Sequence, residues 1–199
     1  MSYENKTVAF YNSNAQDFIE GTLSVDVSHL YAEFESHLPD EASVLDVGCG
    51  SGRDLKYFAE QGYQAIGLEP SSELATFAEQ HSGKQVICGS IQDTDWRDAF
   101  DGIWCCASLL HVPKDDLGAV FKKLAIALRD QGVMYVSFKY GESEEERNGR
   151  FFTDLTEESL AAYVSACSEL TIEKTWLTKD ARPGRESEQW LNAILKKSI

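Results

Sequence analysis

The feature that most constrains this chain is a glycine-rich run, DVGCGSG at residues 46–52, that directly follows a short apolar segment. The segment 43–47 is rich in β-branched and aliphatic residues, which predicts a buried strand. Leu55 and Phe58 begin a helical pattern that Gly62 is expected to end. Glycine permits the positive φ of a sharp strand-to-helix turn and lets a ligand approach the backbone near the positive end of a helix. A parallel α/β sheet usually binds its ligand at such a turn.

Strand and helix patterns alternate along most of the remaining chain. Further strands are expected at residues 64–69, 85–88, 101–106 and 132–138. Helices are expected at 27–38, where Pro39 ends the pattern, after a cap at Ser71 or Ser72, and at 115–128. Strands separated by helices predict a parallel sheet.

The last third of the chain departs from this alternation. Thr156 is expected to cap a helix at 157–166, and two strand patterns follow at 170–178 and 189–197. The turn-rich connection 179–188 is too short for a parallel crossover, so these strands are expected to pair as an antiparallel hairpin. The acidic run from Glu142 to Glu146 is interpreted as a solvated loop without a chemical role.

A carboxylate follows the second expected strand. Glu69 lies 21 residues after Gly48, where its oxygens can accept both hydroxyls of a ribose. An isolated glycine run is as readily a purely structural turn, but the strand, the helix and the acid around this one together favour an adenosine ligand. A dinucleotide fold would share these features. Its usual fingerprint needs a third glycine where this chain has Arg53.

At this point the chain resembles a known family. The segment VLDVGCGSG at 44–52 closely resembles motif I of class I S-adenosylmethionine-dependent methyltransferases, GLEPS at 67–71 resembles motif II, and FDGIW at 100–104 resembles motif IV. The resemblance covers nearly the whole chain. It implies an α/β, Rossmann-like seven-stranded sheet in the order 3-2-1-4-5-7-6 with strand 7 antiparallel. The SGRD ending of motif I also resembles the small-molecule, tellurite-resistance-type branch.

The resemblance also implies a domain layout and a cofactor site. The chain is expected to be one methyltransferase domain, 1–199, with 1–40 as a helical cover of the site and 41–199 as the Rossmann-like core. The cofactor would be S-adenosyl-L-methionine, with S-adenosyl-L-homocysteine as product. The implied cofactor-binding residues are Tyr11, Asp46, Gly48, Cys49, Gly50, Glu69, Pro70, Ser90, Ile91 and Cys106.

Some of these residues have expected roles. Gly48 and Gly50 would line the methionine part, Asp46 would support the turn or the cofactor amine, and Glu69 would hold the ribose. Glu69 and Ser90 both stand where relatives more often carry aspartate. Tyr11 and Phe18 are interpreted either as aromatic lids over the cofactor or as ordinary packing residues.

Methyl transfer from a sulfonium needs an in-line approach, so orientation matters more than a fixed set of catalytic groups. His111 is the best candidate for a catalytic base, since imidazole titrates near neutral pH. The alternative is a helix-capping or packing histidine. Arg182 and Arg185 are candidates for binding an anionic acceptor through bidentate guanidinium contacts. Their alternative is solvated loop charges that pair with Glu186 or Glu188.

The composition narrows the functional classes. The chain has 199 residues, enough for one domain, and 33 acidic against 18 basic residues give a net charge of -15. That charge repels phosphate backbones, which makes nucleic acid an unfavourable partner. No apolar run reaches the roughly 18 residues of a membrane span, and residues 1–10 lack the basic-then-apolar order of a signal peptide, so a cytoplasmic protein without membrane contact is expected.

The five cysteines show no CxxC pair and no histidine at zinc-ligand spacing, so no metal is expected and most are interpreted as buried free thiols. Cys105 and Cys106 are adjacent on a strand and face opposite sides, so they cannot jointly bind a metal.

The leading functional hypothesis is a methyltransferase that acts on a small molecule. A methyltransferase acting on RNA or protein, a catalytically silent cofactor-binding module and, more remotely, a nicotinamide oxidoreductase stay open. The sequence does not specify the acceptor, the methylated atom, the need for a base or the oligomeric state.

Overall fold

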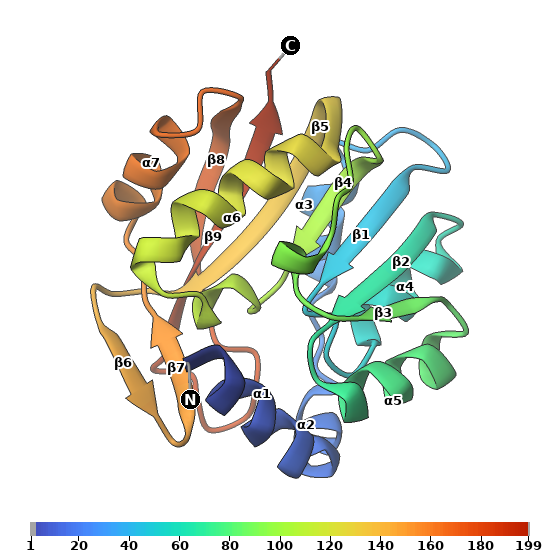
Figure 1. The fold of residues 1–199 in the computed structure, drawn as a ribbon, viewed down its shortest axis with the longest axis vertical. Helices are drawn as coiled ribbons and strands as arrows, with labels where there is room; N and C mark the ends of the chain where they lie inside the picture. The colour runs from blue at the N-terminus through green and yellow to red at the C-terminus, as the bar shows by residue number, and fades with distance from the viewer. Residues whose placement is uncertain (1–2, 199) are drawn as a thin grey trace.

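The fold is built on one seven-stranded sheet (Figure 1). The structure is a computed structural model that describes residues 3–198, so Met1, Ser2 and Ile199 of the expected domain lie outside the described residues. The strands of the sheet are β1 (Ser43–Val47), β2 (Gln64–Glu69), β3 (Val86–Cys88), β4 (Phe100–Cys105), β5 (Leu128–Lys139), β8 (Leu170–Lys179) and β9 (Gln189–Lys197). Their spatial order is β3-β2-β1-β4-β5-β9-β8.

The predicted topology is confirmed. β1 pairs in parallel with both β2 and β4, and β4 pairs in parallel with β5. β9 then runs antiparallel to β5 and to β8. Counted within this sheet, the order is the expected 3-2-1-4-5-7-6, and the final hairpin forms because its connection is too short for a crossover helix.

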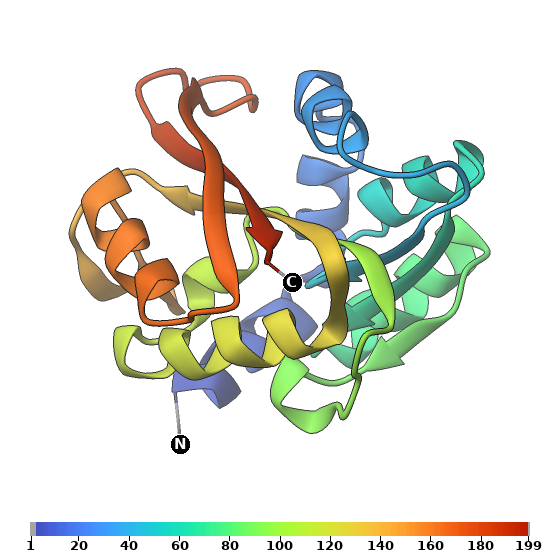
Figure 2. The same cartoon turned by 90° about the horizontal axis from the view of Figure 1, so that it is seen from above.

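Helices cover both faces of the sheet, as Figure 2 shows from above. The α-helices are α1 (Tyr3–Ser13), α2 (Ala15–Thr22), α3 (Ser28–Glu35), α4 (Arg53–Glu60), α5 (Ser72–Ser82), α6 (Lys114–Ala127) and α7 (Glu157–Ser165), with short 3₁₀ turns η1 (Ile91–Asp93) and η2 (Leu109–His111). Apolar side chains of α6 and α7 pack with one face of the sheet, including Leu45 and Ile103. Those of α3, α4 and α5 pack with the other, around Val44 and Trp104.

The helix caps agree with the sequence. The hydroxyl of Ser71 accepts a hydrogen bond from the Leu74 amide at 3.3 Å, which makes Ser71 rather than Ser72 the cap of α5. The hydroxyl of Thr156 accepts one from the Ser159 amide at 3.3 Å, as predicted for α7. These side chains satisfy amide groups that have no partner inside their helices.

Two element boundaries differ from prediction. The helix expected at 27–38 is α3 and ends at Glu35, because the amides of His37 and Leu38 bond three residues back and tighten the chain into turns before Pro39. β5 begins at Leu128, within the helix expected at 115–128. Leu128 pairs with Phe100 across a register shift that apolar periodicity does not reveal.

The acidic segment at 142–146 was wrongly interpreted as a loop. β6 (Glu144–Arg147) pairs antiparallel with β7 (Arg150–Thr153) in a small separate hairpin. The glutamates of β6 are exposed, but Phe151 and Phe152 of β7 are buried. The exposed strand β6 therefore pairs with β7, whose phenylalanine side chains are buried.

Candidate functional site

A cavity of about 580 Å³ opens where β1, β2, β4 and β5 end. That volume lies within the usual range of roughly 300–1,000 Å³ for small-molecule sites. Parallel strands present their carboxyl ends at one edge, and the loops that follow them converge there. In Figure 1, α1, α2 and the β6–β7 hairpin gather at this edge of the sheet. The cavity is therefore bounded by the sheet on one side and by added elements on the other.

The glycine run forms a tight turn at the floor of the cavity. Gly48, Gly50 and Gly52 have φ values of 67°, 54° and 73°, all in the left-handed region. The Gly48 amide donates to the Leu68 carbonyl at 2.7 Å, which folds the turn against β2. A Cβ on Gly48 would lie 2.5 Å from the Cβ of Ser108. Gly48 is thus required for packing, whatever ligand the turn holds.

Gly50 faces the cavity itself. A Cβ there would lie 3.0 Å from a ring carbon of Phe18, a side chain of α2 that also lines the cavity. The missing side chain leaves a narrow space between the turn and this ring. A ligand that reaches the backbone at Gly50 would occupy that space.

Glu69 connects the turn to the loop after β2. One carboxylate oxygen accepts the Gly50 amide at 2.9 Å and the other accepts the Ser71 amide at 2.9 Å. Burial raises the pKa of Glu69 to about 7, although both amide hydrogen bonds act in the opposite direction. Each oxygen of an ionised carboxylate can accept a second hydrogen bond. Glu69 lines the cavity and can therefore accept ligand hydroxyls while it holds the turn.

Asp46 lies beneath the turn, outside the residues that line the cavity. It is 2% exposed, and Oδ2 finds no hydrogen-bond partner within the described part of the chain. Burial, followed by repulsion from Asp54, raises its pKa well above the usual range. Of its two expected roles, this position favours support of the turn.

A second buried carboxylate, Asp54, was not anticipated. It accepts hydrogen bonds from the Tyr31 hydroxyl at 2.5 Å and the Trp104 indole at 2.8 Å, and Arg53 forks onto both of its oxygens. Burial opposes its ionisation, but the charge and hydrogen bonds of Arg53 lower the pKa of Asp54. Arg53 and Asp54 line the cavity beside the turn. From the sequence, Arg53 was noted only because it replaces the third glycine of a dinucleotide fingerprint, and Asp54 was not noted.

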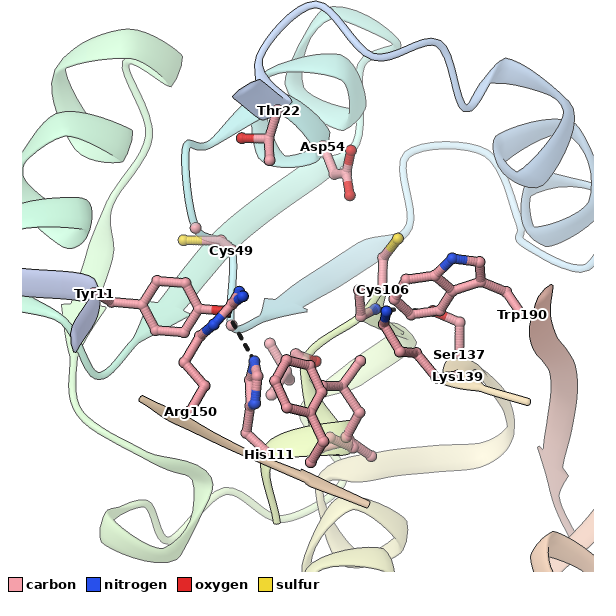
Figure 3. A pocket seen from close by; sticks show the side chains of 18 of the residues that line it. Tyr11, Thr22, Cys49, Asp54, Cys106, His111, Ser137, Lys139, Arg150 and Trp190 are labelled. Carbon is pink, nitrogen blue, oxygen red and sulfur yellow. Dashed lines mark hydrogen bonds between the residues drawn. The ribbon is translucent and has the colours of Figure 1, made fainter. Parts of the chain in front are cut away.

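His111 lies in η2 and contacts the helical cover (Figure 3). Its Nδ1 is 2.6 Å from the Phe151 carbonyl and its Nε2 is 2.9 Å from the Tyr11 hydroxyl. A carbonyl can only accept, so Nδ1 carries the proton and Nε2 accepts from Tyr11. Burial lowers the pKa of His111 to about 4. His111 is therefore neutral near pH 7, and its lone pair is engaged by Tyr11.

This geometry bears on the expected base. In the arrangement seen here, Nε2 could take a substrate proton only after the Tyr11 hydroxyl moved away. His111 lines the cavity, so its role as a base stays a prediction. Its two hydrogen bonds, to Tyr11 and to the Phe151 carbonyl, support the alternative that it is a packing histidine. Tyr11 and Phe18 also line the cavity, with ring centroids 5.1 Å apart in an edge-to-face contact.

Arg182 and Arg185 both line the cavity, as the acceptor hypothesis requires. The guanidinium of Arg182 forks onto Asp180, with Nε at 2.9 Å and Nη2 at 2.5 Å. These hydrogen bonds lower the pKa of Asp180 to about 2 against the opposing effect of burial. Arg185 lies 3.6 Å from Glu188, one of the two partners considered from sequence. Asp180 was not considered, and it occupies the bidentate face of Arg182.

The remaining expected cofactor residues also reach the cavity. They are Cys49, Pro70, Ser90, Ile91 and Cys106. The Asp93 carboxylate accepts the Ser90 amide at 3.0 Å, as part of a local capping box, and also accepts the Ser90 hydroxyl at 2.7 Å. Cys105 is buried in the core and Cys106 is half-buried at the cavity wall. Within residues 3–198, no three metal-type side chains gather in one place.

The sequence reasoning missed the hairpin that forms one wall of the cavity. Arg147, Arg150 and Phe152 line the cavity from its strands. The turn between the strands is Asn148-Gly149, with φ values of 50° and 79°. Asn-Gly between two extended segments is the strongest short-range hairpin signal, and it could have identified this wall.

Comparison with known proteins gives one domain family and several relatives. Residues 45–136 match the family described as "Methyltransferase domain". A Bacillus subtilis protein, YqeM, named provisionally as a methyltransferase, is 33% identical over 119 residues, which are 54% of this chain and 48% of that one. A ubiquinone biosynthesis O-methyltransferase of Bradyrhizobium diazoefficiens is 32% identical over 99 residues, 47% of this chain and 38% of that one. The chain thus spans less than half the length of these curated relatives.

Solved structures agree on the fold. The 1,6-didemethyltoxoflavin-N1-methyltransferase of Burkholderia thailandensis, solved with S-adenosylhomocysteine, has a TM-score of 0.83 at 23% identity and covers 99% of this chain and 89% of its own. A magnesium protoporphyrin IX methyltransferase of Synechocystis has a TM-score of 0.75 at 17% identity, covering 100% of this chain and 98% of its own. At such identities the likeness establishes the architecture.

Proposed function

We propose that this chain is a class I S-adenosylmethionine-dependent methyltransferase that binds S-adenosylmethionine and transfers the methyl group to a small-molecule acceptor. The match of residues 45–136 to a methyltransferase domain and the similar fold of a solved methyltransferase support this proposal. One observation carries the proposal. The glycine turn and the buried carboxylate of Glu69 meet at one end of a cavity large enough for a nucleoside and a second ligand. The space that a Cβ on Gly50 would fill is the space a cofactor needs.

The residues have distinct roles in this proposal. Glu69 accepts the ribose hydroxyls, Gly48 and Gly50 border the methionine part, and Ser90 and Ile91 border adenine. Cys49, Pro70 and Cys106 complete the walls, and Asp46 holds the turn from beneath. Tyr11 and Phe18 cover the site from the N-terminal helices. When bound, the cofactor supplies an electrophilic methyl on a sulfonium, and the side chains around the cavity orient the acceptor and exclude water.

The enclosure of the cavity supports a small acceptor. α1, α2 and the β6–β7 hairpin all contribute lining residues, which leaves a bounded site rather than an open groove. Two of the similar proteins carry names that refer to small molecules, one to ubiquinone biosynthesis and the other to 1,6-didemethyltoxoflavin. The net charge of -15 makes RNA a less favourable acceptor, while protein substrates stay as the second candidate.

Several expectations stay as proposals beside this one. They are the single domain with its N-terminal cover, the base role of His111, the acceptor contacts of Arg182 and Arg185, the tellurite-resistance-type branch and the cytoplasmic location. No helix within residues 3–198 is long and apolar enough to cross a bilayer.

Isothermal titration with S-adenosylhomocysteine and with NAD tests the cofactor. We expect S-adenosylhomocysteine to bind and to raise the melting temperature, whereas NAD should do neither. At 100 times Kd the ligand should add about 2.7 kcal/mol to the free energy of unfolding. Binding of NAD alone would refute the proposal. Labelled S-adenosylmethionine incubated with metabolite extracts then identifies the acceptor. Binding without transfer to any extract component would favour the silent module.

A further inference from the structure

Most basic side chains that line the cavity lie within salt-bridge distance of a carboxylate, and Glu188 is shared by two of them. The pairs are Arg53 with Asp54, Lys139 with Glu188, Arg147 with Asp154, Arg182 with Asp180 and Arg185 with Glu188. Arg150 and Lys179 also line the cavity, and among residues 3–198 neither lies within salt-bridge distance of a carboxylate. Of these two, only Arg150 has a buried donor without a partner. A guanidinium keeps its proton at any pH a protein survives, so this charge persists.

Arg150 is surrounded by aromatic rings instead of acids. Its guanidinium carbon lies 4.8 Å from the ring centroid of Phe10, 5.7 Å from that of Tyr11 and 5.1 Å from that of Phe152. The faces of aromatic rings attract a cation, but they offer no hydrogen-bond acceptor in the plane of the guanidinium. The N–H groups of the Arg150 guanidinium are therefore available to a hydrogen-bond acceptor from a ligand.

The hydrogen bonds of Arg150 confirm this. Its buried Nε has no partner, and the nearest acceptor of Nη1 is the Tyr11 hydroxyl at a long 3.4 Å. That hydroxyl already donates to His111, which is neutral. A buried N–H without a partner is unfavourable, because it has lost its hydrogen bonds to water. An acceptor from a ligand would remove this penalty.

The position of Arg150 is held from both sides. The Asn148-Gly149 turn fixes the strand that carries it, and a Cβ on Gly149 would lie 3.1 Å from the Phe10 ring. The amide of Phe151, the next residue, donates to the Thr7 hydroxyl of α1 at 3.1 Å. Arg150 is thus placed at the contact between the hairpin and α1, where little rearrangement is needed to bind a ligand.

Arg150 extends into the cavity beside Tyr11, from the wall opposite the glycine turn (Figure 3). The turn already has its own arginine, since Arg53 opens α4 directly after Gly52. Arg150 comes instead from the hairpin wall, together with Phe152, and near His111 of η2. The residues to which the proposed function gives cofactor roles lie on other elements than this hairpin.

We propose that Arg150 is the specificity-determining residue for the acceptor, and that the acceptor carries an anionic oxygen group, such as a carboxylate, bound by Nε and Nη2 of Arg150. The inference rests on the proposed function. It deepens that proposal by naming the charge of the substrate. The same chemistry could come from the carboxylate of the cofactor, so the experiment separates these two sources.

The probes are benzoate and its neutral analogue benzamide, titrated into the full chain and followed by NMR, with and without saturating S-adenosylhomocysteine. We expect the parent protein to bind benzoate about tenfold tighter than benzamide, or about 1.4 kcal/mol. Arg150→Met, which keeps the aliphatic contacts with the rings, should equalise the two. Arg150→Lys keeps the charge without the fork and should retain part of the preference. Arg97→Met, an exposed arginine outside the cavity, is the matched charge control and should match the parent.

Three results would overturn the inference. The parent could bind both probes equally, Arg150→Met could retain the preference for benzoate, or Arg150→Met could weaken S-adenosylhomocysteine binding by about tenfold, which would assign the arginine to the cofactor carboxylate. If Arg150→Met does not fold, Arg150→Lys decides, because an unchanged preference for benzoate contradicts a bidentate contact. Failure of the parent to bind S-adenosylhomocysteine would refute the proposed function instead. The benzoate titration without it would still decide the role of Arg150.

Discussion

The ionisation of Glu69 should control cofactor affinity between pH 6 and 8. Burial raises the pKa of Glu69 to about 7 in the ligand-free protein. Ribose hydroxyls that donate to the carboxylate favour its charged form, so binding should lower this pKa and release a proton. Below pH 7 the affinity for S-adenosylhomocysteine should then fall by up to about tenfold per pH unit, or about 1.4 kcal/mol.

The sign of the effect on stability is the opposite. Because the folded-state pKa of Glu69 lies above its ordinary value of 4.5, the folded protein binds more protons than the unfolded chain between pH 4.5 and 7. The contribution of this group to the stability of the ligand-free protein is therefore lost as the pH rises through that window. Added ligand should reverse the trend, since it binds the ionised form.

Glu69→Gln tests the same geometry. Both carboxylate oxygens accept backbone amides, from Gly50 and from Ser71, so the new amide nitrogen must face one of these donors. An unsatisfied buried donor costs about 1 to 3 kcal/mol, and the variant should melt earlier and bind weakly at every pH. Glu73→Gln makes the same charge change on an exposed residue of α5 and should behave as the parent. Titration calorimetry in buffers of different ionisation enthalpy measures both the affinity and the released proton. A parent Kd that stays constant from pH 6 to 8 would refute the ribose role of an ionising Glu69.

Three further predictions concern the turn and the cover. Gly50→Val should abolish S-adenosylhomocysteine binding while circular dichroism shows a folded protein, because the side chain would meet Phe18 at 3.0 Å and fill the ligand space; unchanged affinity would mean a purely structural turn. Gly48→Ala should fail to fold or melt far earlier, since its Cβ would lie 2.5 Å from Ser108, and a parental melting temperature would contradict this packing. Tyr11→Phe removes the donor to Nε2 of His111 and should raise the pKa of His111 from about 4, as followed by NMR titration; an unchanged value would show that the hydrogen bond is not formed in solution.

The sequence could predict the sheet and the cofactor half because those features depend on local patterns. Apolar spacing identified the seven strands along the chain, and the glycine run placed the crevice after β1. The spatial order of the strands was implied by the family resemblance. Glu69 was found for the same reason, since the acid directly ends β2. Each of these inferences needs only residues that are neighbours in sequence or in successive elements.

The rest of the site depends on contacts between distant residues. Asp54 is held by Tyr31 and Trp104, which lie 23 and 50 positions away, and packing of the whole core decides that meeting. Arg182 is close to Asp180 in sequence, but the backbone conformation of the loop decides that its guanidinium makes two hydrogen bonds to the Asp180 carboxylate. The hairpin at 144–153 was missed because charged, exposed β6 has the composition of a loop. The Asn-Gly pair at 148–149 predicts a hairpin more strongly than the charged composition of β6 predicts a loop.

The two halves of the cavity come from different parts of the chain, and this limits what relatives can say about the acceptor. The segment that matches the methyltransferase family, 45–136, contains the glycine turn, Glu69 and His111. Tyr11 and Arg150, by contrast, lie before and after it. In our proposal the acceptor contacts Arg150, which lies outside the matched segment. The chemical class of the acceptor therefore has to be derived from the side chains of this chain's own β6–β7 hairpin.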